Sequence, residues 1–157
     1  MRAIRALGLT SLGAFVGLMG AAAIAKRAFP SRGDADSDEV ALVAIFDGID
    51  LKSRAKAFRG GSMLAWFGGV AVDLREATLP ADAQLSVHAF WGGVAIRVPP
   101  EWRVESNMNA VMGGVDVSTP EPDSADAPTL TIDGFSLFGG IAVGARVAEA
   151  AFEDAGS

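Results

Sequence analysis

The stretch Phe67-Gly68-Gly69-Val70-Ala71-Val72 decides the fold, because closely similar stretches recur along the chain. The others are Phe46-Asp47-Gly48-Ile49-Asp50-Leu51, Trp91-Gly92-Gly93-Val94-Ala95-Ile96, Met112-Gly113-Gly114-Val115-Asp116-Val117 and Phe138-Gly139-Gly140-Ile141-Ala142-Val143. They begin at positions 46, 67, 91, 112 and 138, so the steps are 21, 24, 21 and 26 residues. A period of this length is typical of a solenoid, in which each repeat forms one coil.

Apolar residues alternate on both sides of each glycine pair, which predicts a strand on each side. Around Trp91, for example, they are Leu85, Val87 and Ala89, then Val94, Ile96 and Val98. From Phe67 to Val70 the step is three residues, so the alternation changes parity at the glycines. We therefore expect a corner there that needs either a positive φ or a close backbone approach. The corner glycines are Gly48, Gly68, Gly69, Gly92, Gly93, Gly113, Gly114, Gly139 and Gly140.

The pattern predicts an all-β domain over residues 40–146, built as a single-stranded β-helix of about five short coils. A two-layer sandwich is the alternative, but five equivalent corners favour stacking each coil on the last. The corner residues are expected to form the most prominent column of the core; they are Phe46, Phe67, Trp91, Met112 and Phe138. We expect the segment before the first coil to cover one end of the stack. A short helix or tail over residues 147–157 is expected to cover the other.

The twenty residues from Ala6 to Ala25 carry no charge and lie between Arg5 and Lys26. As a helix they would be ~30 Å long, the thickness of a hydrocarbon core, so residues 1–27 are predicted to form one transmembrane helix with basic flanks. A cleavable signal peptide is the alternative, because Ala23-Ile24-Ala25 is a small-x-small site. Basic residues nearly balance across the span, and the short amino terminus favours an extracytoplasmic β domain.

Within this segment Gly13 and Gly17 form a Gly-x-x-x-Gly pair on one helical face. Such a pair lets a second membrane helix approach closely, so pairing of two chains through it is one interpretation. The alternative is that the glycines only reflect the small-residue composition common in membrane helices.

Residues 28–39 are predicted to form an acidic linker. Their Asp34-Ala35-Asp36-Ser37-Asp38 run has the spacing of a calcium loop. However, Glu39 stands where that loop needs glycine and Ile45 where it needs glutamate, so a solvated acidic spacer is the better interpretation.

The composition excludes thiolate nucleophiles, disulfides and metal sites built from cysteine and histidine. The chain has no cysteine and one histidine, His88, and its net charge is −6. None of its 19 acids lies before Asp34, so the β domain is strongly acidic and nucleic acid is not an expected partner. His88 alternates with apolar residues and is expected to face solvent; nothing in the spacing supports a triad with Ser62 and Asp73. We expect no catalytic residue, metal or cofactor.

Two groups of residues are candidates for interaction. The residue before each corner residue is also large and apolar, and an outward-facing column would form a binding stripe of Ile45, Trp66, Phe90, Val111 and Leu137. The alternative is that the corner turns both columns inward. Lys52, Arg54 and Lys56, followed by Arg59, form a basic strip that either docks on acidic partners or lipid head groups or protects an exposed edge.

Three stretches carry a resemblance to a known family. They are Ala57-Phe58-Arg59-Gly60-Gly61-Ser62, Phe67 to Ala77, and Trp91 to Pro100. Together, over roughly residues 40–145, they resemble the carboxy-terminal domain of the LiaF-type cell-wall-active-antibiotic response proteins of bacteria. The resemblance implies a right-handed β-helical domain tethered to the membrane, with a role in sensing or transmitting envelope stress. It implies no catalytic residues.

The sequence therefore predicts a non-catalytic, single-pass protein of the bacterial cytoplasmic membrane that binds another membrane protein in envelope-stress regulation. One alternative is a scaffold whose coil ends stack into filaments, which together with the membrane helix would make homo-oligomers. The other is an extracytoplasmic binder of cell-wall or lipid material along the apolar stripe.

Overall fold

The computed structural model describes residues 24, 27–28 and 30–145, and the chain divides into two compact units, Met1–Pro30 and Ser31–Ser157. In this part of the chain, no helix has both the length and the apolar character needed to cross a bilayer. The predicted membrane helix, its Gly13 and Gly17 pair and the predicted carboxy-terminal helix lie outside the described residues, so they stay predictions.

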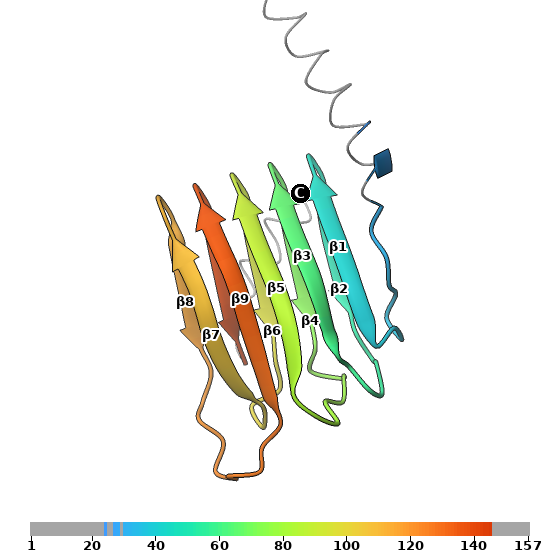
Figure 1. The fold of residues 1–157 in the computed structure, drawn as a ribbon, viewed down its shortest axis with the longest axis vertical. Coiled ribbons are helices and arrows are strands. Elements are labelled where there is room, and N and C mark those ends of the chain that lie inside the picture. Colours follow the sequence, from blue (N-terminus) through green and yellow to red (C-terminus); the bar gives the residue numbers. More distant parts are fainter. Residues whose placement is uncertain (1–23, 25–26, 29, 146–157) are drawn as a thin grey trace, which may run out of the picture. The chain divides into compact units, whose positions relative to one another are not determined.

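Between residues 30 and 145, ten strands form two five-stranded parallel sheets (Figure 1). The first sheet contains β1 (Glu39–Ile45), β3 (Gly60–Trp66), β5 (Ala83–Phe90), β7 (Arg103–Ala110) and β9 (Thr129–Leu137). The second contains β2 (Gly48–Lys52), β4 (Gly69–Asp73), β6 (Gly93–Arg97), β8 (Gly114–Ser118) and β10 (Gly140–Gly144). Each repeat gives one strand to each sheet, so repeat 1 is β1–β2 and repeat 5 is β9–β10. The predicted all-β fold with parallel repeats is confirmed.

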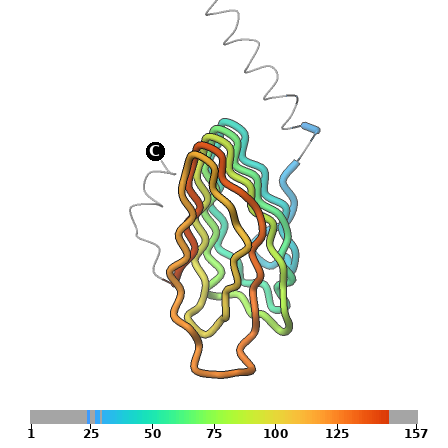
Figure 2. Tube along the Cα trace, turned by 60° about the vertical axis from the view of Figure 1, so that its left-hand side comes forward, coloured from blue at the N-terminus to red at the C-terminus, as the bar shows by residue number. Residues whose placement is uncertain are grey.

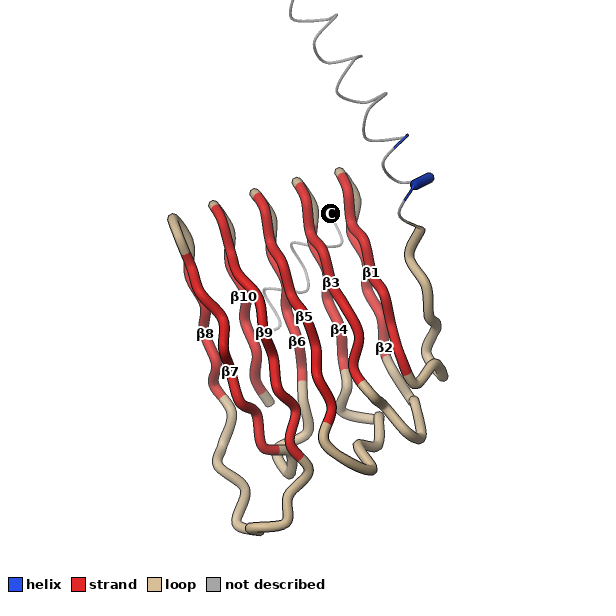
Figure 3. Tube along the Cα trace, in the orientation of Figure 1, coloured by secondary structure: helices blue, strands red, loops and turns tan. Residues whose placement is uncertain are grey.

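The order of the repeats differs from simple sequential stacking. The strand orders are β1-β3-β5-β9-β7 and β2-β4-β6-β10-β8, so repeat 5 lies between repeats 3 and 4 (Figure 3). The loop over residues 119–128, longer than the other loops between repeats, carries the chain back past β7. In β9 both Leu130 and Ile132 are completely buried, whereas β7 is largely polar. Placing β9 inside the sheet and β7 at its edge therefore buries more apolar surface.

The core lies between the two sheets and runs through all repeats. In one row of the first sheet, Leu42, Met63 and Val87 are paired in register and buried. Valine and isoleucine of the second sheet face them, which is the period-two pattern read from the sequence. At the edge where the loops lie, Phe58 and Trp102 stack with ring centroids 6.5 Å apart.

The corner residues do not belong to this core, so the predicted core column is wrong. Phe46, Phe67, Trp91 and Phe138 adopt left-handed backbone conformations, with φ between 46° and 54°. This conformation, which costs a non-glycine residue energy, turns each side chain out at the end of its strand. The column does form, because neighbouring rings along it pack with centroids 4.9–5.1 Å apart, but these four residues are 36–54% exposed.

Close backbone approach, one of the two reasons expected for the glycines, occurs at the first glycine of each pair. A Cβ added to Gly92 would lie 2.2 Å from the carbonyl oxygen of Gly68, and one added to Gly139 would lie 2.0 Å from that of Gly92. The same holds for Gly68 over Asp47 and for Gly113 over Gly139. Asp47 can carry a side chain because repeat 1 is the first of the stack and its corner lies over no earlier repeat.

The second glycine of each pair has more room, which provides a matched test. The nearest atom to a Cβ on Gly93 would be 3.7 Å away. We expect Gly92→Ala to destabilise the domain by several kcal/mol, on the order of a severe packing error, because no flexible side chain can yield. Gly93→Ala should change the free energy of unfolding by less than about 1 kcal/mol. Chemical denaturation of both variants measures this; equal effects would contradict the close approach.

The segment before β1 covers one edge of the first sheet. Arg32 and Ala41 exchange backbone hydrogen bonds of 2.6 and 2.8 Å in an antiparallel bridge. The Ser31 hydroxyl accepts a hydrogen bond from the Val43 amide at 2.9 Å and donates one to its carbonyl at 3.3 Å. This segment therefore covers the β1 edge, as expected, and the chain passes Val43 as it leaves the domain towards its amino terminus.

Candidate interaction surface

The outer face of the first sheet is apolar near the corners and polar near the loops. Side chains on this face form rows across the paired strands. The row next to the corners contains Ile45, Trp66, Phe90 and Leu137, with Val111 beyond the end of β7. The second row contains Val43, Leu64, His88, Phe135 and Asn109, and the third Ala41, Ser62, Ser86, Asp133 and Asn107. We call the first row together with Val43, Leu64, His88 and Phe135 the apolar face.

The structure places the predicted stripe on this outer face and not in the core. Trp66 is 48% exposed and Val111 58% exposed, whereas Phe90 and Leu137 are half-buried. Ile45, in the edge strand that Ser31 covers, is buried. Neighbouring residues of a strand point to opposite faces, so the small residues before each stripe residue, such as Ala65 and Ala89, fill the core instead.

Aromatic contacts join the two rows of the apolar face. The ring centroids of Phe90 and Phe135 are 5.1 Å apart in an edge-to-face arrangement, and those of Trp66 and Phe90 are 6.1 Å apart. His88 lies on the outer face, as expected, but it is half-buried because its ring packs against Phe135 at 5.0 Å. Sequence reasoning missed Leu64 and Phe135 as members of this surface. The signal that could have found them is an apolar residue two positions before the stripe residue, on the same face of the strand.

The three residues considered as a triad, Ser62, His88 and Asp73, do not come together in the structure. Ser62 and His88 lie on neighbouring strands of the first sheet, but Asp73 ends β4 in the second sheet. Its carboxylate forms a fork with Arg75, with Oδ2 2.6 Å from Nη2. Among these residues, no three His, Asp or Glu side chains are grouped so that they could hold a metal ion. The imagined triad is therefore separated by the fold.

The Asp73 carboxyl is the buried ionisable group of the second sheet, and two effects on its pKa compete. Burial raises the pKa, but hydrogen bonds from the Arg75 side chain and amide, together with the charges of Arg75 and Arg97, outweigh it. The pKa therefore lies below its ordinary value of 3.8. A carboxyl with a lowered pKa stabilises the fold above its ordinary pKa and loses that contribution as pH falls through the folded value.

We expect the free energy of unfolding to decrease as pH falls through this acidic range. Asp73→Asn should lower stability near neutral pH and flatten that acid dependence, because the replacement cannot ionise. Arg75→Gln should have a similar effect, since it removes the partner that favours the charged form. Urea unfolding at a series of pH values measures both. An unchanged pH dependence in Asp73→Asn would contradict the assignment.

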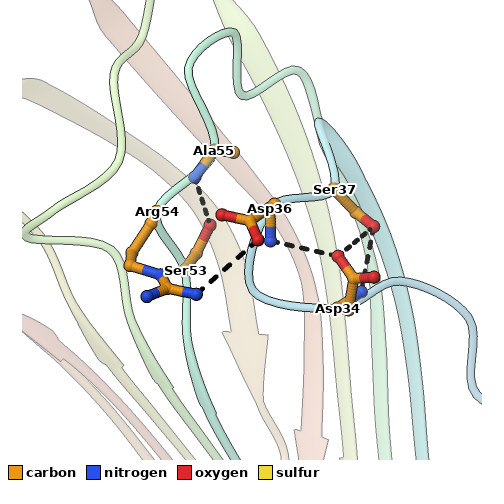
Figure 4. Close-up of polar contacts among 6 residues, drawn as sticks. All are labelled: Asp34, Asp36, Ser37, Ser53, Arg54 and Ala55. Carbon is orange, nitrogen blue, oxygen red and sulfur yellow. Dashed lines mark hydrogen bonds and ion pairs between the residues drawn. The ribbon is translucent and has the colours of Figure 1, made fainter.

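The acidic linker contacts the loop that carries most of the basic strip (Figure 4). Asp34 accepts hydrogen bonds from the Asp36 amide and the Ser37 hydroxyl, and the Ser37 bond is the main cause that lowers its pKa. Asp36 lies 3.6 Å from the Arg54 guanidinium, an exposed ion pair that contributes little stability. The described part of the linker is thus mostly exposed to solvent, as a spacer would be, and is also hydrogen-bonded to the β domain through the Arg54 and Arg59 amides.

Lys52, Arg54 and Lys56 have the spacing of side chains on one face of a strand, but the strand ends at the first of them. Lys52 ends β2, at the edge of the second sheet, whereas Arg54, Lys56 and Arg59 lie in the following loop. All four side chains are exposed. They lie at the loop edge of the domain, opposite the corners.

Comparison with known proteins identifies two mycobacterial relatives. The uncharacterized protein MT0994 of Mycobacterium tuberculosis (strain CDC 1551 / Oshkosh) is 29% identical over 103 residues, which is 65% of this chain and 52% of that protein. The uncharacterized protein Rv0966c of strain ATCC 25618 / H37Rv is 28% identical with the same coverage. The chain therefore spans about half the length of the curated relatives it matches. No family model and no solved structure matches it.

Proposed function

We propose that this chain is a membrane-anchored, non-catalytic interaction protein of the bacterial cell envelope, with a role in stress sensing or regulation. Its repeats form a right-handed β-solenoid, and its partner is another membrane protein. The apolar face carries this proposal. A sheet face that meets only water is normally polar, whereas an apolar row next to the corners, extended by Val43, Leu64 and Phe135 of the adjoining row, indicates a binding surface.

The apolar face has the composition of a protein interface. Trp66 and Phe90 are neighbouring rings of this face, and aromatic side chains of this kind supply much of the binding energy in protein interfaces. The polar third row, with Asp133 hydrogen-bonded to Gln84 and to Asn107, borders the face on the loop side. An apolar centre with a polar rim is the usual anatomy of a specific contact.

A binding role also agrees with the ionisable groups. The perturbed carboxyls, Asp34 and Asp73, are both explained by local hydrogen bonds to neighbouring residues. Neither lies on the apolar face. A non-catalytic role needs no other chemistry from these side chains.

Three acids at the ends of the stack support a discrete protein over the filament alternative. In a head-to-tail filament, the next copy's Asp47 would lie over Gly113, as Gly113 lies over the carbonyl of Gly139. The Cβ of that Asp47 would then clash with the carbonyl of Gly113. In the second sheet, the row Ala71, Ala95 and Ala142 has Asp50 at one end and Asp116 at the other. Stacked copies would bring these two carboxylates about 4.8 Å apart, one strand spacing.

Photocrosslinking in the native membrane tests the proposed partner. A photoreactive residue at Trp66 or Phe90 should give a discrete adduct with another membrane protein. Ser62, exposed on the same strand as Trp66 but in the polar row, is the matched control and should give little adduct. A probe at Arg54 tests the basic strip separately. Adducts of equal yield at Ser62 and Trp66, or a ladder of self-adducts only, would contradict the proposal.

Sedimentation velocity of the full chain in detergent tests the end-stacking argument. The unmodified protein should sediment as a discrete species at all concentrations. Asp47→Gly combined with Asp50→Ala removes both the steric and the charge obstacle, so we expect this variant to self-associate more strongly. Long polymers of the unmodified protein would favour the scaffold instead.

A further inference from the structure

The five corners form an apolar ridge along one edge of the β domain. Because the strands of each sheet are parallel, all corners lie at the same edge, as the stacked turns in Figure 2 show. The ridge consists of the exposed corner side chains and the exposed neighbours Trp66 and Val111. Its members are Phe46, Trp66, Phe67, Trp91, Val111, Met112 and Phe138, each at least 36% exposed.

Charge is almost absent from this edge and concentrated at the opposite one. The corner tetrads are Ile-Phe-Asp-Gly, Trp-Phe-Gly-Gly, Phe-Trp-Gly-Gly, Val-Met-Gly-Gly and Leu-Phe-Gly-Gly, and their one ionisable residue is Asp47. The loops at the other edge carry many charges, including Arg54, Lys56, Asp82, Glu101 and Asp123. The domain is therefore polarised along its strands, with aromatic rings at one end and charges at the other.

The chain enters the domain beside this ridge. Ser31 is hydrogen-bonded to Val43, only three residues before Phe46, and the chain from Arg32 back to Ser31 runs towards the corners. The uncharged run ends at Ala25, six residues before Ser31. Six residues span at most ~20 Å, so a membrane segment ending there keeps the corner edge close to the bilayer.

We propose that the apolar ridge inserts into the interfacial layer of the bilayer that holds the uncharged amino-terminal run. Tryptophan and phenylalanine are suited to this layer, where an apolar ring meets lipid and the indole N–H meets water. This arrangement directs the charged loops, the basic one with Arg54 and Lys56 as well as the acidic one over residues 119–128, away from the hydrocarbon of the bilayer. It also stands the apolar face upright beside the membrane, where another membrane protein would meet it. The inference rests on the proposed membrane anchor.

The three tryptophans of the chain make the test specific. Trp66 and Trp91 are 48% and 54% exposed on the ridge, whereas Trp102 is 5% exposed. Trp102 immediately precedes β7, whose eight residues lead to the corner, so it lies ~26 Å from that edge. Trp102 is therefore an internal control that should not meet lipid.

The experiment measures tryptophan fluorescence of the full chain in phosphatidylcholine vesicles with and without bromine on the acyl chains, which quenches rings in contact with it. Trp66→Phe and Trp91→Phe are surface changes that keep an aromatic ring and leave the core Trp102 in place. We expect brominated lipid to remove most of the emission of Trp66 and Trp91. The double variant, which retains Trp102 alone, should lose almost none.

The possible results distinguish failure of the ridge insertion from failure of the membrane anchor. If the chain floats with the vesicles and the unmodified protein is quenched no more than the double variant, the ridge does not insert, and the anchor survives. The same lack of quenching is expected if the ridge binds a protein instead of lipid, because the vesicles contain no other protein. If the chain does not float with the vesicles, both the anchor and the insertion are wrong.

Discussion

The structure depends on one close contact, the approach of each corner to the carbonyl oxygen of the corner beneath it. With Gly68, Gly92, Gly139 and Gly113 at this place, the chain reverses from one sheet to the other without a Cβ between stacked backbones. The amide of the next residue then donates to the same carbonyl, as Gly93 does to Gly68 at 3.1 Å. This contact fixes the register of both sheets at once, because both strands of a repeat begin or end at it. All the rows of side chains follow from that register.

The same corner explains why large apolar side chains lie outside the core. The aromatic corner residues Phe46, Phe67, Trp91 and Phe138 take a left-handed conformation, so each ring projects from the end of its strand instead of entering the core. The stripe residue, one position before the corner residue, faces outward. The alanine or serine before it points into the core in most repeats, and neighbours in a strand point to opposite faces. The ridge and the apolar face are thus two consequences of one turn. Stacking between the rings offsets part of the cost of their exposure and of the strained backbone.

These two surfaces adjoin along the row that contains Trp66, which gives the domain a direction. The ridge forms its apolar end, the apolar face continues from that end along the first sheet, and the loops with their charges form the other end. A protein bound to a membrane through its amino terminus can use such an arrangement to present one sheet to a neighbour in the same membrane. Asp47, Asp50 and Asp116 at the ends of the stack oppose its extension by a second copy, because the Asp47 Cβ would clash and the other two carboxylates would lie side by side.

The sequence by itself determined the strands, the corners and the repeat, because alternation of apolar residues and recurrence of the glycine pair are local properties of the chain. It could also identify the stripe beginning at Ile45 as one of two possible outcomes, since parity alone does not tell which side of a strand faces the core. Only the tertiary structure decided that repeat 5 lies between repeats 3 and 4, because the gain in burying Leu130 and Ile132 between two neighbours is a property of the whole sheet. Likewise, only the tertiary structure shows the left-handed backbone of Phe67 and its aromatic equivalents that places the aromatic column outside, because the chain must turn there from one sheet into the other and apolar character alone does not reveal backbone angles.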